Sequence, residues 1–274
     1  MYRVIKREQI VPNIHLLVLE TDKIYRNAKA GEFIVVRVDE QGERIPLNIV
    51  DWDERSVSAV FMEVGTSTRK LAGLKEGDYI ETLAGPLGKP TVMVSNQTIM
   101  CIGGCYGIGA LLPIVKAFKN NNNKIITAIE ARSSFLLYWQ NRLSNYSDEL
   151  YEITRDGTRG YVGHINTFIE EYLKKSNVDM IYCQGCTYLT YFVSMITKPK
   201  GIKTIIGLNP IMIDATGMCG VCRVIINGEM KFACVDGPEF DGHTVDWENL
   251  LARRHIYIRE EQKSLSFYEC ERYG

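Results

Sequence analysis

Several features that would place a protein in a broad class are missing from this sequence. No stretch approaches the roughly 20 consecutive apolar residues that a membrane-spanning helix needs, although 46% of the 274 residues are hydrophobic. Residues 1–20 alternate polar and apolar side chains and lack the continuous apolar core of a secretory signal peptide. Lysine and arginine form no basic stripe, and the formal net charge is −1, which argues against nucleic-acid binding. These absences predict a soluble, cytoplasmic protein.

Histidine is scarce, with four residues in the chain. None of them stands in a pattern typical of acid–base catalysis. We therefore interpret His15, His164, His243 and His255 as surface or packing residues and expect no catalytic acid–base residue.

The patterning of the chain changes twice, and its length allows two or three compact units. In residues 1–96, short segments rich in β-branched residues are separated by turn residues, which predicts an antiparallel β-barrel. In residues 97–205, apolar strands alternate with helical periodicity, which predicts an α/β domain with a doubly wound parallel sheet. One of the helices is expected over 135–145. Residues 206–274 are rich in glycine and cysteine, which predicts a small module stabilised by a bound metal cluster and followed by a C-terminal tail.

Eight cysteines are the most unusual feature of the composition, because in a cytosolic chain they indicate metal or redox chemistry. Cys219 and Cys222 form a C-x-x-C pair, and a hairpin turning at Asn227-Gly228 would return Cys234 beside Cys222. Three thiolates at this spacing suit a 2Fe–2S cluster. They also suit zinc, with His243 as a candidate fourth ligand. Both interpretations remain open on spacing alone.

The segment 209–254 resembles the C-terminal end of the small subunit of NADH-dependent reduced ferredoxin:NADP⁺ oxidoreductase, an electron-bifurcating flavoenzyme. That subunit is similar to the electron-transfer subunit of dihydroorotate dehydrogenase, which carries cysteine where the bifurcating enzyme carries aspartate. The resemblance covers nearly the whole chain. It implies a 2Fe–2S cluster with four ligands, namely Asp214, Cys219, Cys222 and Cys234. By its own pattern, Asp214 would be interpreted only as a turn residue capping the loop.

Two segments of the barrel region suit a phosphate-bearing cofactor. Arg44 precedes a strand that opens with proline, and the segment 65–68 opens a short helix whose free N–H groups suit a phosphate. Taken singly, these are common strand-entry and helix-cap patterns. Their order along the chain, followed by the G-P-L-G of residues 85–88, resembles that of the ferredoxin-reductase-like flavin barrel. That family usually has Thr or Ser where this chain has Asn48. The resemblance implies FAD bound by Arg44, Pro46, Leu47, Asn48, Gly65, Ser67 and Thr68.

The segment 101–110 follows a buried strand and opens a helix, where a dinucleotide pyrophosphate would bind. After the next strand, Glu130 suits ribose hydroxyls and Arg132 with Ser133 suits a 2′-phosphate, so NAD and NADP both remain possible. The candidate NAD(P) contacts are Gly103, Gly104, Gly107, Arg132 and Ser133.

Two cysteines depart from the pattern of related reductases. Cys105 replaces a glycine of the phosphate loop, and Cys186 replaces a proline near the nicotinamide. Three interpretations stay open: neutral drift to small packing residues, loss or change of the nucleotide site, and a second metal site formed by Cys105, Cys183 and Cys186.

The expected function is that of an electron-transfer flavoprotein subunit. A nicotinamide nucleotide exchanges hydride with FAD, FAD exchanges electrons with the 2Fe–2S cluster, and the resemblance implies a larger iron–sulfur flavoprotein partner. One alternative is the dihydroorotate dehydrogenase electron-transfer subunit, which Asp214 disfavours. The other is a relay or scaffold subunit with a degenerate nucleotide site.

Overall fold

The computed structural model describes residues 1–24 and 26–273, so that Gly274, the end of the third predicted unit, lies outside it. The expected antiparallel barrel is a seven-stranded sheet in the order β6-β1-β2-β5-β4-β3-β7. It encloses an apolar core that includes Leu17, Ile34 and Phe61. Helix α1 (Thr66–Gly73) packs against this core through the buried Leu71. The strands are β1 (Tyr2–Val11), β2 (Ile14–Glu20), β3 (Phe33–Arg37), β4 (Ile45–Trp52), β5 (Ser56–Met62), β6 (Tyr79–Ile80) and β7 (Thr82–Leu87).

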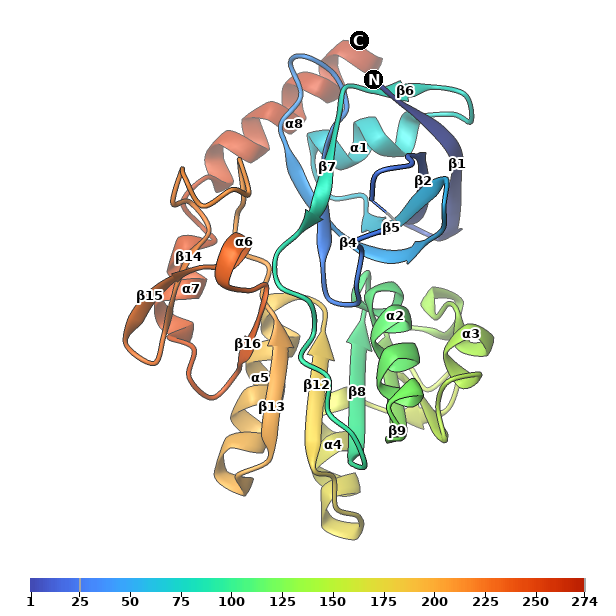
Figure 1. Cartoon of the computed structure of the whole chain (residues 1–274), viewed down its shortest axis with the longest axis vertical. Coiled ribbons are helices and arrows are strands. Elements are labelled where there is room, and N and C mark those ends of the chain that lie inside the picture. The colour runs from blue at the N-terminus through green and yellow to red at the C-terminus, as the bar shows by residue number, and fades with distance from the viewer. Residues whose placement is uncertain (25, 274) are drawn as a thin grey trace.

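The expected parallel sheet is also confirmed. Its order is β11-β10-β9-β8-β12-β13-β16, and every pairing is parallel except the last. Figure 1 shows the central strands standing below the barrel with helices on both sides. The elements are β8 (Thr98–Gly104), α2 (Gly107–Asn120), β9 (Lys124–Ala131), β10 (Glu149–Thr154), β11 (Tyr161–Val162), α4 (Ile165–Lys175), β12 (Met180–Gln184), α5 (Thr187–Thr197), the 3-10 turn η2 (Lys198–Lys200) and β13 (Lys203–Gly207).

The helix expected over 135–145 is wrong as a single element. The chain forms a 3-10 turn, η1 (Ser134–Leu136), and a short helix, α3 (Gln140–Ser144), separated by Trp139 in a left-handed conformation with φ 59°. The break lets the buried Tyr138 hydroxyl donate to the carbonyl of Cys105 at 2.9 Å and accept from the backbone N–H of Gly109 at 2.9 Å. A tertiary contact therefore overrides the local helical periodicity.

The C-terminal segment contains the expected hairpin, β14 (Arg223–Ile226) and β15 (Glu229–Phe232), which turns through Asn227 and Gly228 at φ 51° and 78°. It is followed by α6 (Ala233–Asp236), β16 (Glu239–Asp241) and α7 (Trp247–Arg253). β16 pairs antiparallel with β13, so the small module extends the edge of the α/β sheet. We did not expect this shared sheet from the sequence.

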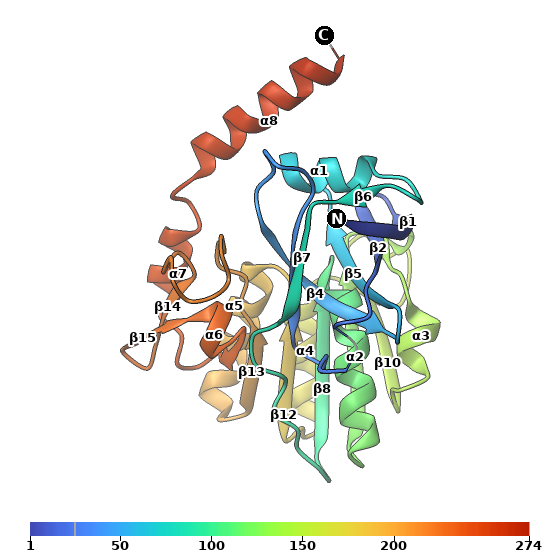
Figure 2. The ribbon, with the colours of Figure 1, turned by 45° about the horizontal axis from the view of Figure 1, so that its top comes forward.

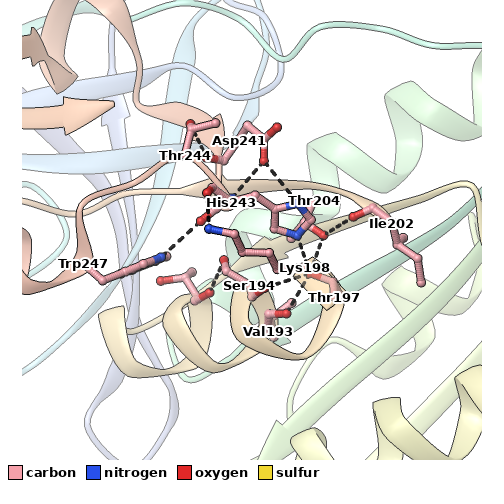
Figure 3. Close-up of polar contacts among 12 residues, drawn as sticks. Val193, Ser194, Thr197, Lys198, Ile202, Thr204, Asp241, His243, Thr244 and Trp247 are labelled. Atoms are coloured by element: carbon pink, nitrogen blue, oxygen red, sulfur yellow. Dashed lines mark hydrogen bonds and ion pairs between the residues drawn. The ribbon is translucent and has the colours of Figure 1, made fainter. Parts of the chain in front are cut away.

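Polar contacts fasten the small module to α5 (Figure 3). The Thr197 hydroxyl lies 2.8 Å from Nε2 of His243 and accepts a hydrogen bond from Thr204 at 2.7 Å. The amine of Lys198, in η2, donates to the carbonyl of His243 at 3.0 Å. Within the small module, the Trp247 indole donates to the carbonyl of Gly242 at 3.1 Å. His243 is thus a docking residue.

A long final helix, α8 (Ile258–Tyr273), is absent from the sequence-based expectations. Figure 2 shows it reaching from the small module toward the barrel, where it passes α1. The hydroxyls of Thr66 and Ser264 lie 2.9 Å apart, and Arg69 pairs with Glu269. Within the described ranges, no helix combines the length and apolarity needed to cross a membrane.

Candidate cofactor sites

The cluster cysteines meet as the hairpin predicts. Cys222 stands before β14 and Cys234 lies in α6; their Sγ atoms are 3.1 Å apart and both residues are buried. Burial and the neighbouring Cys222 raise the pKa of the Cys234 thiol to about 12. A thiol with this pKa keeps its proton at neutral pH unless a metal replaces it, because metal binding and deprotonation are linked.

Asp214 lies earlier in the segment that leads to Cys219, Cys222 and β14. One carboxylate oxygen accepts from the N–H of Thr216 at 3.0 Å and the other from the N–H of Cys219 at 2.9 Å. These hydrogen bonds lower the pKa of the Asp214 carboxyl. Asp214 therefore forms the turn expected from its own pattern. Its carboxylate also lies beside the predicted ligand Cys219 and could coordinate iron through oxygen.

The four predicted ligands fall into two pairs, Cys222 with Cys234 and Asp214 with Cys219. Across residues 1–24 and 26–273, no three His, Cys, Asp or Glu side chains converge as the ligands of a single ion would. A binuclear cluster takes two protein ligands on each iron, and these two pairs suit it. The zinc interpretation loses its candidate fourth ligand, because His243 is bound to α5.

The flavin segment of β4 presents its residues alternately. Leu47 is buried in the barrel core, whereas Pro46 and Asn48 are half-buried and face away from it, as the period of a strand requires. Leu47 can therefore offer a cofactor only its main chain. Arg44 is exposed just before β4 and, within the described ranges, makes no ion pair with a carboxylate.

The start of α1 keeps its backbone donors available. The Thr68 hydroxyl accepts from the N–H groups of Val64 and Gly65 at 2.9 and 3.0 Å, so it caps its own helix. The N–H groups of Thr66 and Ser67 in the first turn have no intrahelical acceptor, which suits a phosphate. α8 passes directly beside this turn through Ser264.

The glycines of the expected nucleotide loop have packing roles. A Cβ on Gly103 would lie 2.7 Å from the Leu111 side chain, and one on Gly107 would lie 2.3 Å from the carbonyl oxygen of Gln184. These glycines allow α2 to pack tightly against β8 and β12. Their presence alone therefore does not establish a bound dinucleotide.

Glu130, the candidate ribose ligand, is already engaged. It is buried, and its Oε1 lies 2.6 Å from Nε of Arg155 and 3.7 Å from Nδ1 of His164. Arg132 remains exposed beside it, and Ser133 is buried, with its hydroxyl 3.3 Å from that of Thr158.

The structure does not gather Cys105, Cys183 and Cys186 into one site. Cys183 is fully buried in the apolar core on one face of the sheet, and Cys101 is buried in the core on the other face. Cys105 and Cys186 are exposed at the ends of β8 and β12. A three-cysteine metal site is therefore not formed.

Comparison with known proteins agrees with this architecture. Residues 209–246 match the family model described as the iron–sulfur cluster binding domain of dihydroorotate dehydrogenase B. A Thermotoga maritima protein described as a dihydroorotate dehydrogenase B (NAD(+)) electron transfer subunit homolog is 37% identical over 262 residues, covering 95% of this chain and 92% of the relative. The chain belongs to this family of electron-transfer subunits and their homologues.

Solved structures support the same assignment. The NADH-dependent reduced ferredoxin–NADP oxidoreductase, studied for flavin-based electron bifurcation, contains a chain with a TM-score of 0.93 and 34% identity, covering 98% of both chains. Phthalate dioxygenase reductase, with a TM-score of 0.59, 14% identity and coverage of 82% and 85%, shares the fold. The resemblance expected from the sequence is confirmed. The chain is an electron-transfer flavoprotein subunit, and its family supports FAD and a 2Fe–2S cluster as cofactors.

Proposed function

We propose that this subunit carries electrons between a nicotinamide nucleotide and a larger iron–sulfur flavoprotein partner. In this proposal, residues 1–96 hold FAD, residues 97–205 receive the nucleotide, and residues 206–274 hold the cluster. When bound, FAD would supply the conversion between two-electron hydride chemistry and single-electron transfer, and the cluster would supply a one-electron acceptor. The paired arrangement of Asp214, Cys219, Cys222 and Cys234 is the observation that carries it.

The protein residues have separate roles in this proposal. Arg44 and the first turn of α1 would hold the FAD pyrophosphate, and Pro46 and Asn48 would contact the flavin. The nucleotide lies across Gly103, Gly104 and the start of α2. Arg132 is exposed beside Ser133, so a 2′-phosphate would have a cationic partner. Glu130 is paired with Arg155, so its carboxylate is not free to bind ribose hydroxyls. We therefore propose NADP(H) in preference to NAD(H).

An anaerobic titration tests this function. NADPH added to the purified holoprotein should bleach the flavin absorbance more readily than NADH, and Arg132→Ala should reduce that preference about tenfold. Arg159→Ala is a matched control, since Arg159 is held by Glu152. Absence of bleaching with either nucleotide would leave the relay-subunit alternative. Iron measured against FAD should give about two irons per flavin.

The partner and the location of the complex are part of the same proposal. The family and the neighbouring structure support a heteromeric complex. All eight cysteines are free of disulfides, which supports a reducing, cytoplasmic setting.

A further inference from the structure

Two exposed cysteines lie at the same edge of the α/β sheet. Cys105 follows β8, and Cys186 is the N-cap of α5, directly after β12. These strands are hydrogen-bonded neighbours, with Gly103 paired to Gln184, so each cysteine stands two residues beyond the last paired position. Neighbouring strands run about 4.8 Å apart, so the turns that carry the two cysteines leave the sheet side by side.

The two turns remain in contact beyond the last strand pair. The Tyr106 hydroxyl donates to the carbonyl of Gly185 at 2.9 Å. A Cβ built on Gly185 would lie 3.2 Å from the carbonyl oxygen of Gly104, and one on Gly107 would lie 2.7 Å from the Cα of Gly185. The residues on both sides of Cys105 therefore lie against Gly185, which precedes Cys186, and this keeps the two cysteines in adjacent turns.

The backbone at Cys105 is unusual for its side chain. Its φ is 53°, in the left-handed region that favours glycine, so a thiol is kept there at a conformational cost. Partial desolvation and the nearby Cys186 raise the pKa of the Cys105 thiol, in line with the closeness of the two turns. Cys183 and Cys101 are buried in the two apolar cores and take no part in this pair.

We propose that Cys105 and Cys186 form a redox-active dithiol that exchanges with low-molecular-mass disulfides and closes to an intramolecular disulfide. This site is separate from the cluster cysteines, and it does not require that a nicotinamide nucleotide binds.

The chemistry proceeds in two balanced steps. The Cys186 sulfur, at the N-terminus of the 11-residue helix α5, loses its proton and attacks one sulfur of a small disulfide. This forms a mixed disulfide and releases one small thiol. Cys105 then loses its proton, and its sulfur attacks the Cys186 sulfur and displaces the second small thiol. The protein loses two electrons and two protons, and the small disulfide is reduced to two thiols.

The test uses the holoprotein, with iron and flavin bound, and oxidised glutathione as the probe. Peptide mapping of the product should show a disulfide between the peptides that contain Cys105 and Cys186, and intact mass should fall by two hydrogens. Dibromobimane, which becomes fluorescent when it joins two close thiols, should link the same peptides in the reduced protein. The peptide map separates this pair from any bond among Cys219, Cys222 and Cys234.

Single substitutions assign the roles of the two thiols. Cys105→Ser should accumulate one stable glutathione adduct on Cys186, whereas Cys186→Ser should slow the first addition roughly tenfold. Cys270→Ser, which removes an exposed thiol of α8, should leave the Cys105–Cys186 linkage unchanged. If neither the disulfide nor the bimane linkage joins the two peptides, or if Cys105→Ser takes up no glutathione on Cys186, the proposal is overturned.

Discussion

The Tyr182 hydroxyl donates a 2.5 Å hydrogen bond to Oε1 of Glu239. Thr91 donates to the same oxygen at 2.7 Å, and the side chain of Gln184 donates to the Tyr182 hydroxyl at 2.8 Å. Although Glu239 is half-buried as a residue, its carboxylate is enclosed, and burial raises its pKa to about 7. These hydrogen bonds connect the segment after the barrel, through Thr91, and the central strand β12, through Tyr182, to Glu239 of the small C-terminal module.

Glu239 should make stability depend on pH. Below its ordinary value of 4.5 both folded and unfolded states carry the proton, and as pH rises through about 7 the folded state must give it up at a cost. Between pH 4.5 and 7.5, the free energy of unfolding of the wild type should therefore fall by on the order of 3 kcal/mol relative to that of Glu239→Gln. Urea denaturation of both proteins across this range measures the difference. Glu229 lies at an exposed position of the hairpin. The free energy of unfolding of Glu229→Gln should therefore change with pH as that of the wild type does between these pH values.

Asp214 should be required for a normal cluster. Asp214→Ala removes the oxygen donor together with the hydrogen bonds from Thr216 and Cys219, so iron content and visible absorbance should fall severalfold. Asp214→Asn is the matched control, because it keeps an acceptor for the turn but loses the charge. If Asp214→Ala retains wild-type iron and spectrum, the residue only caps the loop.

His243 should affect docking of the small module and leave metal content alone. His243→Ala loses the contact with Thr197, so the free energy of unfolding should fall by about 1 kcal/mol. Iron and zinc analysis should match the wild type. A loss of bound metal with an unchanged melting temperature would restore His243 as a ligand.

Gly107 should be needed for folding even without a nucleotide. Because a Cβ at this position would lie 2.3 Å from the backbone carbonyl of Gln184, Gly107→Ala should cost about 1–3 kcal/mol in the nucleotide-free protein. Gly73, in α1, has open space at its Cβ position, so Gly73→Ala should be neutral or slightly stabilising. Equal stability of the two variants in chemical denaturation would contradict the packing role.

Local patterns predicted most of the secondary structure. The β-branched segments before residue 96 and the alternating strands and helices after it are confirmed, as is the hairpin at Asn227-Gly228. These depend on side-chain periodicity and turn chemistry, which are readable from neighbours in the chain. The break at Trp139 was missed because its cause, the Tyr138 hydroxyl reaching Cys105 and Gly109, lies about thirty residues away in sequence.

The cofactor residues divide in the same way. Cysteine spacing by itself predicted a metal site on the loop before the hairpin, and family resemblance added Asp214. Tertiary structure alone decided that Cys183 enters the core while Cys105 and Cys186 remain exposed. Cys183 lies within β12 and packs into the core on one face of the sheet, whereas the other two lie in the turns after β8 and β12. Tertiary structure likewise decided that Glu130 pairs with Arg155 and that Glu239 is enclosed by Tyr182 and Thr91, since burial and charge pairing depend on residues that only the fold brings together.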